Sequence, residues 1–181
     1  MFKIPVLGIC AQSSGMGKTT LLERLLPALA AYGLKVSVIK QTHADFDVDQ
    51  PGKDSHRLRE AGAGQVLLSS QNRWVLMTEQ KADTEDIRLL DLVRHLDPNL
   101  ADLVLVEGFR HAPIPKIEVF RPACGKKLLA LHDAHIIAVA SDIPVVTPRP
   151  LLDLNSVGGV AEFIVAWWGQ QQRVKAMAMT G

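Results

Sequence analysis

The chain has 181 residues, which is about the length of one domain. Its 20 Lys and Arg residues nearly balance its 19 Asp and Glu residues, and this argues against a protein that binds nucleic acid through a basic surplus. Hydrophobic residues make up 48% of the chain and charged residues 22%, so disorder and coiled coil are excluded for most of its length.

The first part of the chain alternates between strand and helix signals. Residues 4–11 are apolar without alternation, as in a central strand covered on both faces. Leucines at helical spacing predict a helix over residues 21–29 that ends near Gly33. The segment KVSVIK over residues 35–40 predicts a second strand.

The middle of the chain predicts shorter elements. A short helix is expected over residues 54–60, and two strands over residues 65–70 and 73–78 flank a tight turn at Gln71. Apolar residues at helical spacing between residues 87 and 96 predict the next helix.

Two further buried strands are expected over residues 102–106 and 136–140, followed by a last helix over residues 155–168. Residues 173–181 are expected to be a frayed tail. No apolar run is long enough to span a bilayer, and we expect a cytoplasmic protein that binds neither membranes nor nucleic acid.

This alternation predicts an α/β fold in three layers with a mainly parallel sheet. Strand signals over residues 116–121 and 128–131, separated by Pro122 and Gly125, predict an antiparallel hairpin. We therefore expect a single domain over residues 1–172, with a hairpin excursion over residues 111–131.

The most informative segment is SSGMGKTT, residues 13–20, between the first strand and the first helix. Small residues let successive backbone N–H groups point at one phosphate, and the helix start adds partial positive charge. Lys18 would reach the β- and γ-phosphates, and the Thr19 hydroxyl would ligate Mg²⁺. The P-loop pattern has Gly at the position of Gln12 in this chain. The Gly-x-Gly-x-x-Gly fingerprint of dinucleotide-binding proteins is disfavoured, because Thr20 occupies the position of its third Gly.

A P-loop also needs an acidic residue on the metal side, and Glu107 follows the apolar strand over residues 103–106. Three further carboxylates, Asp45, Asp47 and Asp49, follow the second strand and are candidates to approach the metal or an attacking water. The same loop fails as a calcium site because Gln50 replaces the required Gly. A zinc site at its histidines is disfavoured, since no cysteine accompanies them.

These segments together resemble the MobB adaptor family of P-loop GTPases, which serves molybdopterin-guanine dinucleotide biosynthesis. The resemblance covers residues 4 to about 172 and rests on SSGMGKTT, KQTHADFDVDQPGKDSHRLREAGA, SSQNRWVLMTE, LVLVEGFR and AVASD. It implies a homodimer formed through residues 111–131 that binds GTP and Mg²⁺ and hydrolyses GTP weakly. It also implies partnership with the guanylyltransferase that joins GMP to molybdopterin, and molybdopterin itself is a further candidate ligand.

The resemblance also assigns roles to individual residues. It implies that the phosphates are held by Ser14, Gly15, Met16, Gly17, Lys18, Thr19 and Thr20. It implies metal binding by Thr19 and Glu107, with Asp47 or Asp49 nearby, so that Lys18, Glu107, Asp47 and Asp49 are the catalytic candidates. Gln71 is a candidate nucleotide contact, and Asp142 is the candidate reader of guanine because the chain lacks an Asn-Lys-x-Asp signature.

Two other functions share these motifs. A small-molecule kinase would have the same loop, but the candidate lid near residues 72–85 carries only Arg73 and Lys81. A nickel metallochaperone GTPase would need a Cys- or His-rich tract that the sequence lacks. Slow hydrolysis is expected because no arginine finger is identifiable within the chain, although Arg73 or Arg110 of a dimer mate would supply one.

Overall fold

The structure is a computed structural model that describes residues 4–42, 47–79 and 88–179. Residue contacts divide it into two compact units. The first spans Met1–Gln41 and Arg88–Gly181, and the second spans Thr42–Ile87. The sequence predicts one domain over residues 1–172, whereas the residue contacts form two compact units.

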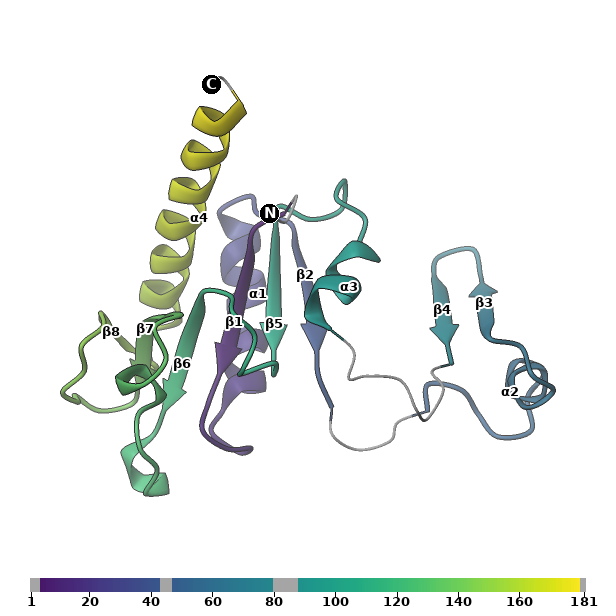
Figure 1. The fold of residues 1–181 in the computed structure, drawn as a ribbon, viewed down its shortest axis with the longest axis horizontal. Helices are drawn as coiled ribbons and strands as arrows, with labels where there is room; N and C mark the ends of the chain where they lie inside the picture. The colour runs from purple at the N-terminus through teal and green to yellow at the C-terminus, as the bar shows by residue number, and fades with distance from the viewer. Residues whose placement is uncertain (1–3, 43–46, 80–87, 180–181) are drawn as a thin grey trace. The chain divides into compact units, whose positions relative to one another are not determined.

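A six-stranded parallel sheet forms the centre of the first unit (Figure 1). Its strands lie in the order β2-β5-β1-β6-β7-β8. Their bounds are β1 Val6–Cys10, β2 Val36–Lys40, β5 Leu103–Glu107, β6 Lys116–Phe120, β7 Ile136–Ser141 and β8 Leu151–Asp153. Because every neighbouring pair is parallel, the carboxyl ends of all these strands meet at one edge of the sheet.

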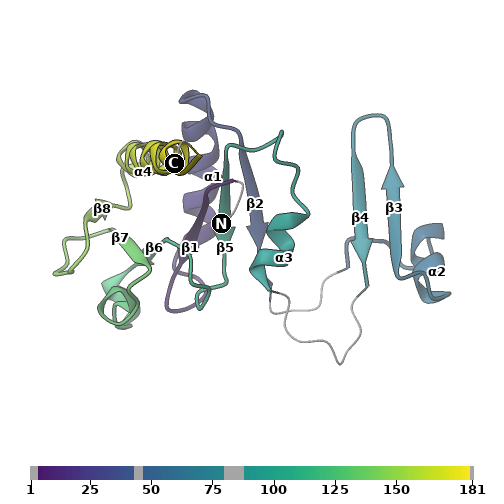
Figure 2. The ribbon, with the colours of Figure 1, turned by 45° about the horizontal axis from the view of Figure 1, so that its top comes forward.

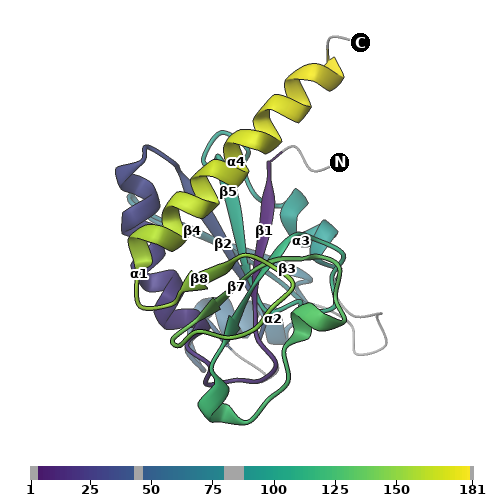
Figure 3. The same ribbon diagram turned by 90° about the vertical axis from the view of Figure 1, so that its left-hand side faces the viewer.

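Both faces of this sheet are covered, which explains why β1 and β5 are apolar without alternation. Helices α1 (Lys18–Ala31) and α4 (Val157–Met179) lie side by side on one face (Figures 2 and 3). They enclose Leu7 and Ile9 of β1 in the larger core cluster. Helix α3 (Leu89–Arg94) packs against Val6 on the other face. The first unit therefore has the three predicted layers.

The predicted helices are present, but with different bounds. Helix α1 begins at Lys18 and contains Pro27, and Gly33 after it has the left-handed φ of 80°. Helix α4 continues to Met179, past the predicted end at residue 168, so the expectation of a frayed tail from residue 173 is wrong for the residues that the structure describes. None of the helices described here is long and apolar enough to cross a membrane.

The second unit contains the antiparallel part of the fold. Strands β3 (Gln65–Ser69) and β4 (Trp74–Thr78) pair as a hairpin, and helix α2 (Asp54–Glu60) contacts β3. The Ser70 N–H donates to the Arg73 carbonyl at 2.8 Å, so the chain turns at Gln71, as the sequence predicts.

The hairpin predicted over residues 111–131 is wrong. Strand β6 is a central strand that runs parallel to both β1 and β7, and Leu129–Leu131 is a 3₁₀ turn (η2) after another short turn at Pro122–Cys124 (η1). The mainly parallel sheet with an antiparallel hairpin is confirmed as a fold class, but the hairpin is β3–β4.

Candidate functional site

The glycine-rich loop joins β1 to α1 at the carboxyl edge of the sheet. Gly15 and Gly17 have φ values of 76° and 95°, in the left-handed region that favours glycine. Met16 between them is 1% exposed and packs into the core, which fixes the loop from below. Residues Ser14 and Gly15 are exposed, and α1 begins directly after Gly17. The loop thus presents backbone N–H groups and a helix start to solvent, as an anion site requires.

Two side chains of α1 bear on the site. The Lys18 ammonium donates to the carbonyl of Ser13 at 3.3 Å, so it lies across the loop. The Thr19 hydroxyl donates to Glu107 Oε1 at 2.8 Å. Sequence reasoning paired Thr19 with Glu107 across 88 positions, and the structure brings the two side chains together.

A third side chain joins this pair. Lys40, the last residue of β2, is the register partner of Glu107, the last residue of β5. Its Nζ lies 3.3 Å from Thr19 Oγ1 and 3.3 Å from Glu107 Oε2. Sequence reasoning did not select Lys40, although its place at a strand end on the same edge as the loop would have indicated it.

Two arginines from neighbouring segments donate hydrogen bonds to backbone carbonyls of the loop. The Arg110 guanidinium donates to the carbonyl of Gln12 at 3.1 Å, and that of Arg121 donates to the carbonyl of Met16 at 3.1 Å. Arg121 also forms an ion pair with Asp142, at 2.6 Å between Nη1 and Oδ2. Arg121 was missed from the sequence, although it directly follows β6 at the carboxyl edge.

A cavity opens beside Asp142 at the ends of β7 and β8. Its volume is about 390 Å³, within the usual range for small-molecule sites. Its lining consists of Ser141, Asp142, Ile143, Pro144, Leu151, Leu152, Asp153 and Asn155. Ser141 is 3% exposed, and its Oγ has no hydrogen-bond partner within the described part of the chain. The cavity therefore combines apolar walls with the carboxylates of Asp142 and Asp153.

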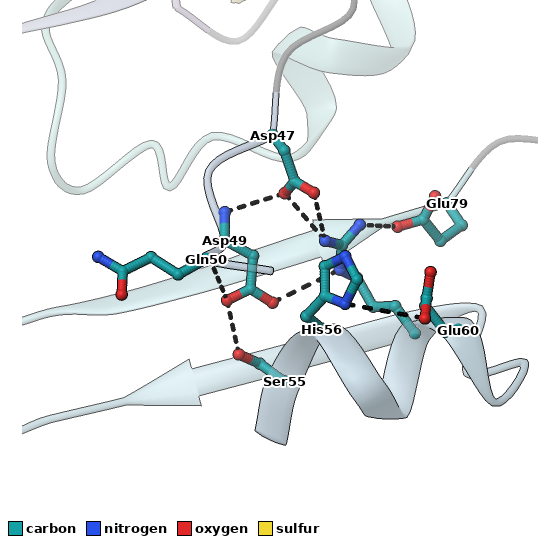
Figure 4. A network of polar contacts seen from close by, with 8 residues as sticks. Asp47, Asp49, Gln50, Ser55, His56, Glu60 and Glu79 are labelled. Carbon is teal, nitrogen blue, oxygen red and sulfur yellow. Dashed lines mark hydrogen bonds and ion pairs between the residues drawn. The ribbon is translucent and has the colours of Figure 1, made fainter. Parts of the chain in front are cut away.

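The acidic loop, which carries Asp47 and Asp49, belongs to the second unit (Figure 4). Both carboxylates form ion pairs with Arg59 of α2. The Arg59 guanidinium donates to both oxygens of Asp47, at 2.9 and 2.8 Å, and to Glu79 at 2.7 Å. The hydrogen bond from Arg59 holds the pKa of Asp47 below its ordinary value. Asp49 accepts from the hydroxyl of Ser55 at 2.7 Å.

The sequence-predicted residues of the second unit therefore have local roles in the structure. Asp47 and Asp49 anchor the loop to α2, and Gln71 lies in the β3–β4 turn. Their approach to a metal or a nucleotide stays a prediction. Asp45 and His43, a histidine of the same loop, lie outside the described residues.

Among the described residues, no group of three or more His, Cys, Asp or Glu side chains is arranged to hold a metal ion. Magnesium in phosphate sites needs fewer protein ligands, since one or two oxygens of the protein act together with phosphates and water. The Thr19 hydroxyl and the Glu107 carboxylate suit that mode, and the Lys40 ammonium already lies against both.

The parallel sheet and the loop that joins β1 to α1 define an α/β protein of P-loop architecture. Residues 6–142 match the family model of molybdopterin guanine dinucleotide synthesis protein B. The chain therefore belongs to that family, the MobB family.

Full-length relatives agree with this assignment. The chain is 50% identical over 169 residues to the molybdopterin-guanine dinucleotide biosynthesis adapter protein of Escherichia coli strain K12, covering 93% of this chain and 95% of the relative. It is 46% identical to the adapter protein of the same name from Haemophilus influenzae, covering 91% and 90%.

Solved structures show the same architecture. A crystal structure of molybdopterin-guanine biosynthesis protein B has a TM-score of 0.66 at 29% identity and covers 90% of this chain and 99% of that one. The MobB homologue from Bacillus stearothermophilus also has a TM-score of 0.66, at 22% identity, with coverage of 91% and 98%, and shares the fold.

Proposed function

We propose that this protein is a GTP-binding adapter with weak GTPase activity that acts in molybdopterin-guanine dinucleotide biosynthesis in the cytoplasm. Two kinds of support converge. The relatives at 50% and 46% identity are named adapter proteins of that biosynthesis. The observation that carries nucleotide binding is the 2.8 Å hydrogen bond from Thr19 to Glu107 beside an exposed glycine loop, because it joins the metal-side groups of a P-loop.

The phosphate chain of the nucleotide would lie on the glycine-rich loop between β1 and α1. The backbone N–H groups that would donate to it belong to Ser14, Gly15, Met16, Gly17, Lys18, Thr19 and Thr20. The Lys18 ammonium, which now contacts the Ser13 carbonyl, would turn toward the β- and γ-phosphates. Mg²⁺ would be held by the Thr19 hydroxyl and, directly or through water, by Glu107. The bound ion would neutralise charge on the transferring phosphate.

Slow hydrolysis of GTP is consistent with the hydrogen bonds that the nearby arginines already form. Arg110 and Arg121 both donate to carbonyls of the loop itself, so their guanidinium groups support its shape. Of the catalytic candidates, Lys18 and Glu107 lie at the loop, whereas Asp47 and Asp49 bond within the second unit. The chain thus offers a binding site with few groups free to stabilise a transition state.

We place the nucleobase in the cavity beside Asp142. The cavity lies at the same strand edge as the loop, and Arg121 connects Asp142 to the loop carbonyl of Met16. A carboxylate accepts from both N1–H and N2–H of guanine, whereas adenine offers no such pair of donors. Asp142 uses Oδ2 for Arg121, and we propose that its other oxygen contributes to guanine recognition.

The proposed partners are a second copy of the chain and the guanylyltransferase of the pathway. Within residues 111–131, strand β6 does not suit the dimer interface, because it is buried inside the sheet. The β3–β4 hairpin suits it better, since an isolated two-stranded hairpin is marginal and has free edges to pair with an identical hairpin. Its exposed apolar side chains are Leu67, Leu68, Trp74, Val75 and Leu76. Direct binding of molybdopterin stays a prediction.

Calorimetric titration with GTP and ATP in the presence of Mg²⁺ tests the proposal. We expect the chain to bind GTP, Lys18→Ala to lose binding of both nucleotides without loss of fold, and the exposed Lys126→Ala control to bind normally. Asp142→Asn should weaken GTP more than ATP, and equal losses would remove Asp142 from base recognition. Unchanged GTP affinity in Lys18→Ala would refute the phosphate site.

The adapter role has its own test. Addition of the chain to the pathway's guanylyltransferase should raise the yield of molybdopterin-guanine dinucleotide, and the Lys18→Ala variant should do so less. The small-molecule kinase alternative gains nothing from the relatives, which are named adapters. Phosphoryl transfer from GTP or ATP to a small acceptor would nevertheless replace the adapter proposal by the kinase.

A further inference from the structure

The ammonium of Lys40 lies where the proposed site needs a divalent cation. It is 3.3 Å from Thr19 Oγ1 and 3.3 Å from Glu107 Oε2, while the other oxygen of Glu107 accepts from Thr19 at 2.8 Å. One positive charge therefore contacts both groups that we assign to Mg²⁺. The register of β2 with β5 places Lys40 directly beside Glu107, so the contact follows from the pairing of the strands.

Burial explains why Glu107 needs a cation. Glu107 is 8% exposed, and a buried carboxylate without a counter-charge is costly. The Lys40 side chain is 55% exposed, so its ammonium balances the carboxylate while part of the side chain stays in water. A flexible stem that already reaches water can leave this contact without steric strain, so the lost attraction to Glu107 is what opposes its departure.

We propose that Lys40 is a placeholder cation that keeps Thr19 and Glu107 together in the nucleotide-free protein and must leave when a divalent ion binds. The inference rests on the proposed function, because it concerns regulation of the same site. An ammonium and a divalent ion cannot share one carboxylate without strong repulsion. Lys40 therefore disfavours metal binding to the empty protein.

Bound nucleotide changes this balance. The phosphate chain adds negative charge beside Thr19, which attracts the divalent ion and also offers a new counter-charge to the displaced ammonium. Lys40 thus makes metal and nucleotide bind together. Glu107 keeps a counter-charge at each stage, from Lys40 in the empty protein and from the divalent ion in the loaded one. Lys18 differs from Lys40, because its ammonium contacts the loop carbonyl of Ser13 at 3.3 Å.

Binding of Mn²⁺ alone, followed by electron paramagnetic resonance of the free ion, tests the inference. We expect Lys40→Met to bind Mn²⁺ about thirtyfold more tightly than the natural chain without nucleotide, as Coulomb's law gives in water for a unit charge removed from about 4 Å away from a divalent ion. Lys35→Met, at an exposed position before the same strand, is the matched control and should not change the affinity. With GTP present, the difference between Lys40→Met and the natural chain should shrink.

A double variant locates the effect. Glu107→Gln in the Lys40→Met background should abolish the gain, which excludes binding to the carboxylates of the second unit as its cause. Lys40→Gln, which is also neutral but keeps a hydrogen-bond donor, should reproduce the gain, and its melting curve checks the fold.

Equal Mn²⁺ affinity in the natural chain and both neutral variants would overturn the placeholder role even if GTP binds. Absence of GTP binding by the natural chain would instead refute the proposed function.

Discussion

Lys116 provides the sharpest test of how the chain builds the support of its site. It is the first residue of β6 and is 1% exposed, yet its ammonium meets three acceptors. The Nζ donates to the carbonyls of Arg110 and Ala112 at 2.8 and 2.9 Å and lies 2.7 Å from Asp133 Oδ2. These contacts fix the segment that carries Arg110 to the start of β6. The Arg110 side chain in turn donates a hydrogen bond to the Gln12 carbonyl of the phosphate loop.

The variant Lys116→Met keeps most of the buried stem and removes the charge. Loss of one partner from a buried ion pair costs about 3–5 kcal/mol in general. The Asp133 side chain is 27% exposed and can recover some hydration, so we expect the lower end, about 3 kcal/mol. For a chain of this size that corresponds to a decrease in Tm of about 6–12 °C.

Urea unfolding followed by circular dichroism measures this loss, and Lys126→Met at an exposed position is the matched control. Nucleotide affinity should also fall in Lys116→Met, because Arg110 loses its support. A change in the free energy of unfolding below about 0.5 kcal/mol, within the usual range of surface substitutions, would refute the reasoning.

The pH dependence gives an independent check with a definite sign. Partial desolvation would raise the pKa of Asp133, but hydrogen bonds from Lys116 and His135 outweigh it and hold the pKa below its ordinary value of 3.8. A lowered pKa in the folded state contributes stability above 3.8 that is lost as the pH falls through the folded value. The stability gap between the natural chain and Lys116→Met should therefore narrow in acid.

Two further predictions concern glycine and cysteine. Gly108→Ala should destabilise the chain by about 1–3 kcal/mol in a thermal melt, since Gly108 has a φ of 97° and a Cβ there would lie 2.7 Å from Gln41 Cβ. The control is Gly158→Ala, where the added Cβ would meet open space in α4. It should be neutral or stabilising in the same melt. Near neutral pH, Ellman's reagent should modify exposed Cys124 and spare buried Cys10, because burial and then the Glu118 carboxylate raise the pKa of Cys10 to about 12; rapid reaction of both thiols in the native chain would contradict this.

The phosphate loop could be predicted because its signals are local. Gly15 and Gly17 are needed wherever the chain turns with positive φ, and the strand before them and the helix after them follow within a few residues. Glu107 required one more step, the rule that parallel strands end at the same edge. That rule holds, and the hydrogen bond to Thr19 has the expected partners.

The error at residues 111–131 has a physical cause. Charged Lys116 and Glu118 alternate with apolar residues, a pattern typical of a half-exposed strand, yet both are buried in β6. Their partners come from residues 110–112, 129–130 and 133, so no local window of sequence shows that the charges are satisfied. Glu118, for example, accepts from the backbone N–H groups of Leu129 and Ala130 at 2.8 and 2.9 Å.

The acidic loop shows the opposite limit. Asp47 and Asp49 were selected for their charge and their place after β2, and composition alone does not tell a metal ligand from one partner of an ion pair. Arg59, 12 positions after Asp47, is the residue that decides this in the structure. Its spacing from Asp47 could have suggested the pair, because the short helix α2 turns Arg59 back toward the loop.

Arg121 connects two parts of the proposed site that the sequence presents separately. Its Nε holds the carbonyl of Met16 and its Nη1 holds the carboxylate of Asp142, so one rigid guanidinium spans the phosphate loop and the cavity at the end of β7. A base that hydrogen-bonds to the Asp142 carboxylate would weaken the ion pair between Asp142 and Arg121. The hydrogen bond from Arg121 to the Met16 carbonyl, between the two glycines, would then change as well. If the proposed nucleotide site is correct, recognition of guanine and the shape of the phosphate loop would be coupled through this single side chain.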